Sequence, residues 1–440
     1  MEASPSLMAM EQTGQPAAPG AHAWLALAVL CGIYILNFLS RQLPAILAKP
    51  IEDHLHISDG QLGLIGGFYF ALFYCCISIP VGWLADKTNR VRILAAACAI
   101  WSLATMCCGM AAGYLEFAIA YMTVGFGEAG GVPPSYSIIT DLFPTGRRGT
   151  ALGIYNLGPG IGAALGITFG ASIAAAFNWR YAFLLLGGVG IFAAIGVLLT
   201  VREPRRGGLD HIAEQATPAK PGFRQTFVMF FSRPPLILAA LGSGATQLIT
   251  YGLGNFTVLF LMREKGMTLT QVATCYSAVV FTGMSGSMFI SGRLIDRFTR
   301  TSRRAYGLIP ATSLVLAVPL YLGFVQALSW RIALLFLTGT MFLNYFYLSS
   351  AVTLVQEEVR PDQRVMSGAL PLLVMNFIGL GLGPTCVGAA SDFFHKNHPV
   401  HSLQLALYAL APFYLVAICL FLKLADVLRK ENFPVGGMVR

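Results

Sequence analysis

Long apolar runs separated by short polar segments dominate this chain of 440 residues. A hydrocarbon core about 30 Å thick requires roughly 20 apolar residues per helix, and each helix has to satisfy its own backbone groups there. The pattern predicts an all-α membrane protein with six spanning helices in each half. These twelve transmembrane helices are expected at residues 23–45, 60–84, 92–112, 115–140, 149–176, 181–201, 234–261, 270–294, 305–326, 330–355, 365–392 and 402–425.

One polar phrase occurs twice, each time between two apolar runs. Residues Gly82 to Arg90 and Gly292 to Arg300 both read Gly-x-Leu-x-Asp-x-x-x-Arg, and they lie 210 positions apart. Recurrence of the same hinge in two hydrophobic halves is typical of an internally duplicated transporter. The sequence therefore predicts two six-helix bundles related by pseudo-symmetry.

The polar segments divide the chain into five parts. The only long internal polar stretch, from Arg202 to Pro235, is rich in proline and glycine and is interpreted as the linker between the halves. The first 20 residues lack the basic start of a signal peptide. We expect a disordered cytoplasmic tail (1–22), an N-terminal bundle (23–201), a cytoplasmic linker (202–233), a C-terminal bundle (234–428) and a second cytoplasmic tail (429–440).

Composition and charge agree with this organisation. Hydrophobic residues make up 56% of the chain and charged residues only 11%, against about 25% charged residues in soluble proteins. Of the 29 Lys and Arg residues, 22 fall on the side of the membrane that holds the two tails and the linker, and seven fall on the other side. Basic residues favour the cytoplasmic side of a membrane. We therefore expect a cell-membrane protein with both termini in the cytoplasm. Basic residues scattered over the loops also account for the net charge of +9, so this charge does not indicate a nucleic-acid partner.

Neither metal nor catalytic chemistry is indicated. The nine cysteines lie within predicted helices, where they are expected to pack as small apolar residues. His395, His398 and His401 have no carboxylate or cysteine to complete a metal site, and the His54-x4-Asp59 spacing of some acyltransferases falls in a short outer loop. No nucleotide-binding loop is present. We expect no enzyme activity, no cofactor and no metal.

Several phrases point to a known family. The repeated hinge resembles the signature of the major facilitator superfamily between helices 2 and 3, with its weaker echo between helices 8 and 9. The first half resembles the Spinster-like group in particular, through the phrases Asn37 to Arg41, Gly125 to Pro134, Asp141 to Pro144 with Arg147 and Arg148, and Val201 to Pro204. The resemblance implies the major facilitator fold and transport of amphipathic lipids such as lysophospholipids or sphingoid molecules, with proton coupling.

Two positions depart from the Spinster-like pattern. Ser40 stands where the group has Asp, and Tyr121 stands where it has Arg, so opposite charges have disappeared together. One interpretation is that an ion pair between helices 1 and 4 has been replaced by a neutral, hydrogen-bonded pair, since removal of both charges leaves none stranded.

Glu128 is the most informative charge within the predicted spans. It lies 13 residues into the predicted helix 115–140, and a carboxylate at that depth is costly unless it faces a cavity, has a partner or binds a proton. Arg41 is its expected counter-charge; the alternative for Arg41 is a side chain that reaches the outer interface. The candidates for proton coupling or substrate binding are Glu128, Arg41, Asn37, Ser40 and Tyr121.

Two further groups complete the expected site. Polar and aromatic residues within the helices suit a cavity for a molecule with a greasy body and a small polar head: Phe38, Asn156, Gln247, Tyr251, Asn255, Phe256, Asn344, Tyr347 and Asn376. Charges at the cytoplasmic helix ends are interpreted as a gate that holds the halves closed on the inner side: Asp86, Arg90, Asp141, Arg148, Asp296 and Arg300.

These features predict a monomeric secondary transporter that works by alternating access on an amphipathic or anionic substrate, with protons as the coupling ion. A second hypothesis is proton-coupled uptake of small organic anions such as sugar acids, because the helix 4 phrases also resemble that branch. A third is an uncoupled facilitator, lipid scramblase or transporter-like receptor, which the loss of charge at Ser40 and Tyr121 keeps open.

Overall fold

The structure is a computed structural model that describes residues 20–204, 223–358 and 364–430. The expected tails, residues 1–22 and 429–440, lie almost wholly outside the described residues, as does most of the linker. Within the linker range 202–233 the structure describes one helix, α12 (Phe223–Ser232). The described residues form helices and contain no strand.

The N-terminal half is built from ten α-helices and one π-helix, η1, in the described part of the chain. They are α2 (Ala21–Ile46), α3 (Ala48–Leu55), α4 (Asp59–Leu64), η1 (Ile65–Tyr69), α5 (Phe70–Lys87), α6 (Arg90–Met110), α7 (Tyr114–Glu128), α8 (Val132–Leu142), α9 (Thr145–Tyr155), α10 (Gly158–Ala176) and α11 (Trp179–Thr200).

The C-terminal half repeats this plan after α12. Its described elements are α13 (Pro234–Arg263), α14 (Leu269–Gln271), η2 (Val272–Tyr276), α15 (Ser277–Thr299), α16 (Ala305–Gln326), α17 (Trp330–Asn344), α18 (Phe346–Glu358), α19 (Arg364–Met375), η4 (Asn376–Leu382), α20 (Gly383–His395), α21 (Ser402–Tyr408) and α22 (Ala411–Lys430).

Eleven of the twelve predicted spans appear among the described residues as helices long and apolar enough to cross a membrane. The prediction of one continuous helix over 115–140 is wrong, because α7 ends at Glu128 and α8 begins at Val132. Gly130 and Gly131 form a turn at the break, and Pro133 and Pro134 follow it. Prolines lack the N–H that a continuing helix needs, whereas they fit the first turn of a new one.

Two Gly-Pro pairs mark further interruptions. Gly158-Pro159 begins α10 after α9 ends, and Gly383-Pro384 begins α20 directly after the π-helix η4. In both places proline occupies the start of the new helix, where its missing N–H costs nothing. Each pair therefore starts a new helix.

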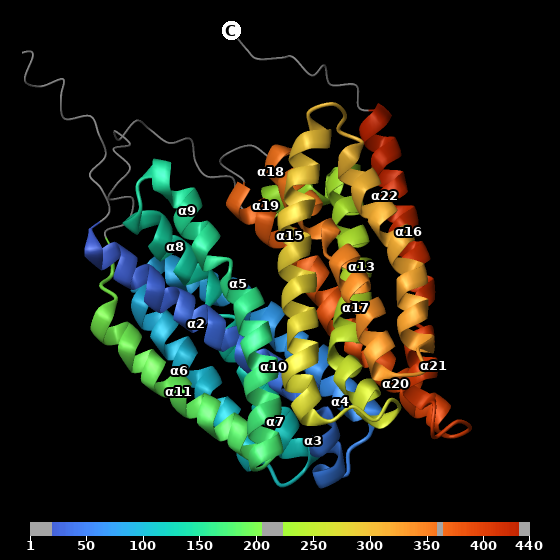
Figure 1. Cartoon of the computed structure of the whole chain (residues 1–440). Coiled ribbons are helices and arrows are strands. Elements are labelled where there is room, and N and C mark those ends of the chain that lie inside the picture. Colours follow the sequence, from blue (N-terminus) through green and yellow to red (C-terminus); the bar gives the residue numbers. More distant parts are fainter. Residues whose placement is uncertain (1–19, 205–222, 359–363, 431–440) are drawn as a thin grey trace, which may run out of the picture.

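The two halves meet at one end of the molecule and diverge toward the other (Figure 1). The end that carries α9 and α18 is called the linker face, and the end that carries α3, α4 and α21 is called the opposite face. The two halves contact each other through four groups of elements. Helix α4 packs on α20; η1 and α5 both pack on η4; α10 packs on η2 and α15; and α13 packs on α2 and α3. This line of contacts is called the seam.

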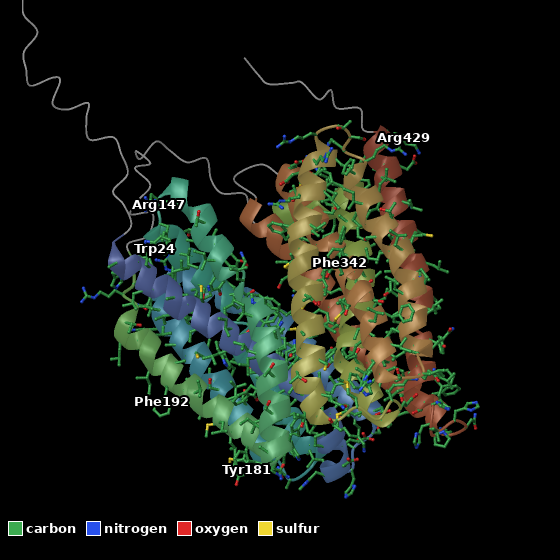
Figure 2. The ribbon with its side chains drawn as sticks, in the orientation of Figure 1. Trp24, Arg147, Tyr181, Phe192, Phe342 and Arg429 are labelled. Carbon is green, nitrogen blue, oxygen red and sulfur yellow. The ribbon has the colours of Figure 1, made fainter. Side chains whose placement is uncertain are left out.

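Large apolar side chains cover the outside of the bundle. Phe192 and Leu199 on α11 are 76% and 80% exposed, and Figure 2 shows Phe192 projecting away from the helices. Trp101, Arg90 and Tyr321 are among the most deeply buried side chains. An apolar exterior over a packed interior is what a lipid environment requires.

Candidate functional site

The break between α7 and α8 places Glu128 at the end of a helix inside the N-terminal half. Its side chain is fully buried, and both carboxylate oxygens have partners. Oε2 accepts hydrogen bonds from Arg41 Nη2 at 2.7 Å and Nε at 3.0 Å, and Oε1 accepts one from Ser40 Oγ at 3.2 Å. A buried carboxylate is therefore compensated by one cation and one hydroxyl, both from α2.

Arg41 is also enclosed by aromatic rings. Its Cζ lies 4.9, 5.0 and 5.1 Å from the ring centroids of Phe38, Phe70 and Tyr74. The side chain is only 10% exposed, so it points into the protein and does not reach toward an outer interface. Ring faces attract a cation, and together with Glu128 they hold the guanidinium at the edge of the central cavity.

Ser40 and Tyr121 do not form the neutral pair that the sequence suggested. Ser40 Oγ bonds the Asn37 carbonyl at 2.8 Å and Glu128, whereas Tyr121 donates its hydroxyl hydrogen to the Arg41 carbonyl at 3.3 Å. Both residues are buried around the Arg41–Glu128 pair. Asn37 is buried beside them, and its Nδ2 has no hydrogen-bond partner among the described residues.

A central cavity with a volume of about 70 Å³ lies between the halves. Arg41 and Tyr121 contribute to it from the N-terminal half. From the other half come two expected residues, Tyr251 and Asn255, and several that the sequence does not single out, among them Thr250, Tyr276, Met284 and Tyr345. The lining combines one cation with aromatic and thioether groups.

Other residues expected to line the cavity lie elsewhere. Asn344 is buried in the core of the C-terminal half, where its amide exchanges hydrogen bonds with the Tyr414 hydroxyl at 2.9 and 3.1 Å. Tyr347 is 2% exposed and also belongs to that core. These two predictions are wrong, because a polar group in an apolar helix can satisfy itself against a neighbouring helix as well as in a cavity.

None of the five remaining candidates lines the central cavity, and Phe256 belongs to a smaller pocket described below. Phe38 covers Arg41, and Asn156 accepts a hydrogen bond from Tyr136 at 2.6 Å. Gln247 is buried against Gly379, and its Oε1 has no partner among the described residues. Asn376 lies in the π-helix η4, half-buried.

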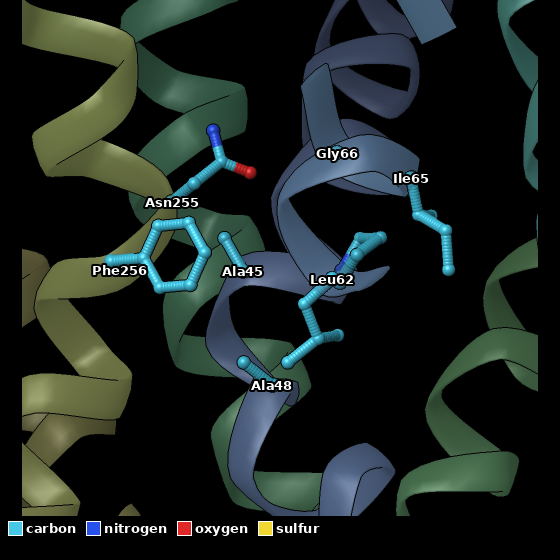
Figure 3. Close-up of a pocket in the computed structure, with 8 residues that line it drawn as sticks. Ala45, Ala48, Leu62, Ile65, Gly66, Asn255 and Phe256 are labelled. Atoms are coloured by element: carbon cyan, nitrogen blue, oxygen red, sulfur yellow. The ribbon is translucent and has the colours of Figure 1, made fainter. Parts of the chain in front are cut away.

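A smaller pocket adjoins the cavity toward the opposite face (Figure 3). It shares Ala45, Gly66 and Asn255 with the central cavity, and Phe256 closes one side of it. The remaining lining is apolar and comes from the end of α2, from α3 and from the segment α4–η1.

The residues interpreted as a gate do not join the halves in this structure. Arg90 is 2% exposed and forms ion pairs with Asp141 and Glu203 and a hydrogen bond to the Pro204 carbonyl, all within the N-terminal half. Arg148 bonds the Thr140 and Phe143 carbonyls at the end of α8. These contacts tie helix ends together inside one half.

Asp296 and Arg300 make no polar contact across the halves among the described residues. Asp296 and Arg300 are exposed and have no hydrogen bond or ion pair among the described residues, while the side chain of Asp86 lies outside the described residues. On the linker face, no hydrogen bond between described residues connects the two halves. Figure 1 shows the ribbons of the two halves diverging toward this face.

Closure is found instead on the opposite face, at residues that the sequence reasoning did not select. Arg263 at the end of α13 binds both oxygens of Asp59 at 2.8 Å and Glu52 Oε2 at 2.6 Å. Ser391 donates to Asp59 at 2.6 Å, and Asp392 accepts from Ser58 Oγ at 2.6 Å and from the Gly60 N–H at 3.0 Å. Burial raises the pKa of Glu52, and Arg263 opposes that shift.

Glu264, next to Arg263, is a second buried carboxyl at this face. Its side chain is 1% exposed, Oε1 accepts from the Gln404 N–H at 3.1 Å, and Oε2 lies 3.6 Å from His401 Nδ1. Burial raises the pKa of Glu264 above the 4.5 of a free glutamate, while Gln404, His401 and Lys265 oppose the shift.

Two comparisons establish the class of protein that this fold and cavity define. The family model described as Major Facilitator Superfamily matches residues 30–384. A protein of Mycolicibacterium smegmatis named MFS-type efflux pump is 30% identical over 409 residues, which cover 91% of this chain and 92% of that protein. The chain belongs to the major facilitator superfamily, and it has the twelve-helix fold of that family.

Within the superfamily the relatives are Spinster-like. Human protein spinster homolog 1 is 27% identical over 405 residues, covering 87% of this chain and 75% of that protein. A solved bacterial homologue of the human lysosomal transporter Spinster, inward-facing and unoccupied, matches with a TM-score of 0.87 and 27% identity over 94% of this chain and 99% of that one. The same homologue in its inward-facing, occupied form gives 0.83 and 26%, with the same coverage. This chain is a Spinster-like multi-pass membrane transporter.

Proposed function

We propose that this protein is a proton-coupled secondary transporter that moves an amphipathic, anionic lipid such as a lysophospholipid by alternating access. The observation that carries the proposal is the buried ion pair between Arg41 and Glu128. Arg41, the cation of this pair, lines the central cavity. One half supplies the ion pair, and the other supplies the aromatic wall.

In this proposal the proton binds Glu128 and the anionic head group of the substrate binds Arg41, so the ion pair links the two binding events. While Glu128 is ionised, its Oε2 holds Arg41 through two hydrogen bonds. Protonation of Glu128 removes the charge that binds Arg41, so the guanidinium becomes available to an anionic head group. Proton binding and substrate binding are thereby linked at one site, as coupled transport requires.

The substrate class follows from the rest of the cavity. Tyr251, Tyr276, Tyr345 and Met284 offer aromatic and thioether groups beside a single cation, which suits an apolar body with a small anionic head. One relative is named an MFS-type efflux pump, and this name favours export.

Charge distribution supports the orientation. The linker face carries most of the 29 Lys and Arg residues of the chain, and basic loops favour the cytoplasm. We assign the linker face to the cytoplasmic side of the cell membrane, with both termini inside and the protein working as a monomer. In this assignment the structure is open to the cytoplasm, and the Arg90 cluster fixes the cytoplasmic ends of the N-terminal half.

The test is transport of a labelled lysophospholipid in proteoliposomes, with and without an imposed pH gradient. Glu128→Gln should abolish the gradient-driven component. Glu116→Gln is the matched control: Glu116 lies on the same helix but is exposed, where it bonds the Ala112 N–H. Each variant is checked for monodisperse behaviour in detergent before reconstitution.

Arg41→Gln combined with Glu128→Gln keeps the test informative if the single variant fails to fold, because the double variant strands no charge. Gradient-driven transport in the double variant would refute the coupling role of the pair. Lipid movement indifferent to the gradient in the native protein would identify a facilitator or scramblase. Transport of sugar acids without lipid would replace the proposed substrate class.

A further inference from the structure

The internal duplication also includes the way in which two short helices, α4 and α14, begin. Ser58 and Thr268 each cap a short helix, and in each case the glutamine three positions later bonds back to the N–H of the capping residue. These capping boxes lie 210 positions apart, like the repeated hinge phrases, and each short helix continues into a π-helix, η1 or η2. π-Helical turns are uncommon and concentrate at functional positions.

A threonine from the opposite half reaches each of these segments. Thr168 on α10 donates its hydroxyl hydrogen toward the carbonyl of Ala273 in η2, at 3.1 Å. The same hydroxyl lies 3.2 Å from the carbonyl of Ala164, four residues earlier on its own helix. Its single hydrogen is therefore shared between an acceptor in its own half and one across the seam.

Thr385 on α20 repeats the arrangement in the other direction. Its hydroxyl lies 3.2 Å from the carbonyl of Gly63 and 2.8 Å from the carbonyl of Gly381, again four residues earlier on its own helix. It also accepts a hydrogen bond from the Phe68 N–H in η1, at 3.1 Å. Gly63 and Ala273 lie 210 positions apart, so the two threonines bind equivalent carbonyls of the duplicated unit.

Close approach of the backbones makes these bonds possible. A Cβ at Gly67 would lie 2.7 Å from Thr385 Oγ1, and a Cβ at Gly63 would lie 2.4 Å from the Pro384 carbonyl oxygen. Glycine at both positions thus allows the hydroxyl to reach a helix backbone in the other half.

We propose that Thr168 and Thr385 are a matched pair of positioning residues that hold the seam closed toward the opposite face and release it during transport. This role rests on the alternating access proposed above. Each hydroxyl keeps a carbonyl of its own helix within reach when the halves separate, so the seam opens without leaving its hydroxyl hydrogen unbonded. A hydroxyl that can switch between two carbonyl acceptors at low cost suits the seam, because the seam has to open and close in every transport cycle.

Hydrogen–deuterium exchange of the purified protein in lipid nanodiscs tests the assignment, with peptides covering 59–69 and 269–280 as the readout. Thr168→Val and Thr385→Val keep the side-chain shape and remove the hydroxyl. Each should raise exchange in its partner segment about fivefold, as expected for loss of one hydrogen bond, and the double variant should affect both segments. Thr168→Ser and Thr385→Ser restore the hydroxyl and should return exchange to the native rate.

Thr338→Val is the control, because within the described part of the chain the Thr338 hydroxyl bonds only the Leu334 carbonyl of its own helix. Unchanged exchange in the valine variants, equal effects of Thr338→Val, or failure of the serine variants to restore exchange would each overturn the assignment. The exchange readout needs no substrate. The expected exchange pattern in a protein that transports no lipid would therefore refute the proposed substrate and leave the seam assignment standing.

Discussion

Arg41 has one carboxylate and three aromatic rings around it, and this environment decides how its charge can be used. The ion pair with Glu128 is buried on the carboxylate side and 10% exposed on the arginine side. Removal of one partner of such a pair strands the other charge, whereas removal of both is often tolerated. The stability of the pair and its function can therefore be separated by mutation.

Glu128→Gln should destabilise the protein by about 3–5 kcal/mol because Arg41 is left buried without a counter-charge. Arg41→Gln together with Glu128→Gln should recover most of that loss. Thermal unfolding of the native protein, both single variants and the double variant in one detergent gives the interaction energy of the pair. Additive effects of the two single changes would show that the residues do not stabilise each other.

Glu264 gives the protein a dependence on pH that is independent of the cavity. Because burial raises its pKa, the folded state favours the protonated form. The resulting stabilisation is complete below about pH 4.5 and is lost as the pH rises through the raised pKa. Glu264→Gln imitates the protonated carboxyl, so the variant should melt roughly 1–3 °C above the native protein at pH 8, and the difference should vanish below pH 4.5.

Asp53→Asn is the control for this pH series, since Asp53 is exposed and pairs with Lys49 on the same short helix. An equal or lower melting temperature for Glu264→Gln at pH 8 would show that His401 and Lys265 outweigh the cost of burial. The groups that face the carboxyl are His401 and Lys265, and the buffer composition is kept the same at each pH.

At the scale of elements, the sequence shows where helices run better than where they break. Apolar runs of membrane length identify the spans because the bilayer imposes length and hydrophobicity on each of them. The break after Glu128 was missed, although Gly130, Gly131 and the two following prolines stand in the sequence. Glycine and proline also occur inside continuous membrane helices, so only the position of the neighbouring helices decides between a kink and a break.

The crossing of α4 with α20 predicts an asymmetry between glycines. A Cβ at Gly63 would meet the Pro384 carbonyl oxygen at 2.4 Å, whereas a Cβ at Gly32 on α2 has nothing within 4 Å. Gly63→Ala should therefore lower the melting temperature and the transport rate, because the backbone has to move. Gly32→Ala should be neutral or stabilise by up to about 1 kcal/mol, since alanine favours the helix.

Unfolding in detergent and lipid transport measure both glycine variants side by side. Wild-type stability in Gly63→Ala would mean that the crossing is looser than these distances imply. Gly388, whose Cβ would lie 2.3 Å from the Asp59 carbonyl oxygen, offers the same test from the other helix.

At the scale of the whole molecule, the duplicated hinge and the apolar runs were enough to predict two six-helix bundles. Of the candidate site residues, Arg41, Tyr251 and Asn255 line the central cavity and Glu128 pairs with Arg41. These residues could be selected from the sequence because charges and polar residues in apolar helices are few, while their roles stay predictions. Asn344 and Tyr347 were assigned to the cavity but lie in the core, since residue type does not show which way a helix faces. The contacts of Arg263 with Glu52 and Asp59 join residues more than 200 positions apart, and no local pattern marks such a pair.

Those contacts predict how the closed face can be loosened. Arg263 holds Asp59 and Glu52 across the seam, and Asp59 is 5% exposed, so Asp59→Asn removes a largely desolvated charge pair. We expect the population open on the opposite face to increase at least about tenfold. Spin labels at the exposed positions Tyr181 and Asn397, in a background without native cysteines, report this as a longer distance between the halves. Lys49→Gln is the control, because its exposed pair with Asp53 lies on the same face but within one half, and such pairs contribute little. A distance distribution that is the same in Asp59→Asn as in the native protein would show that the helix contacts of the seam, without Arg263, keep this face closed.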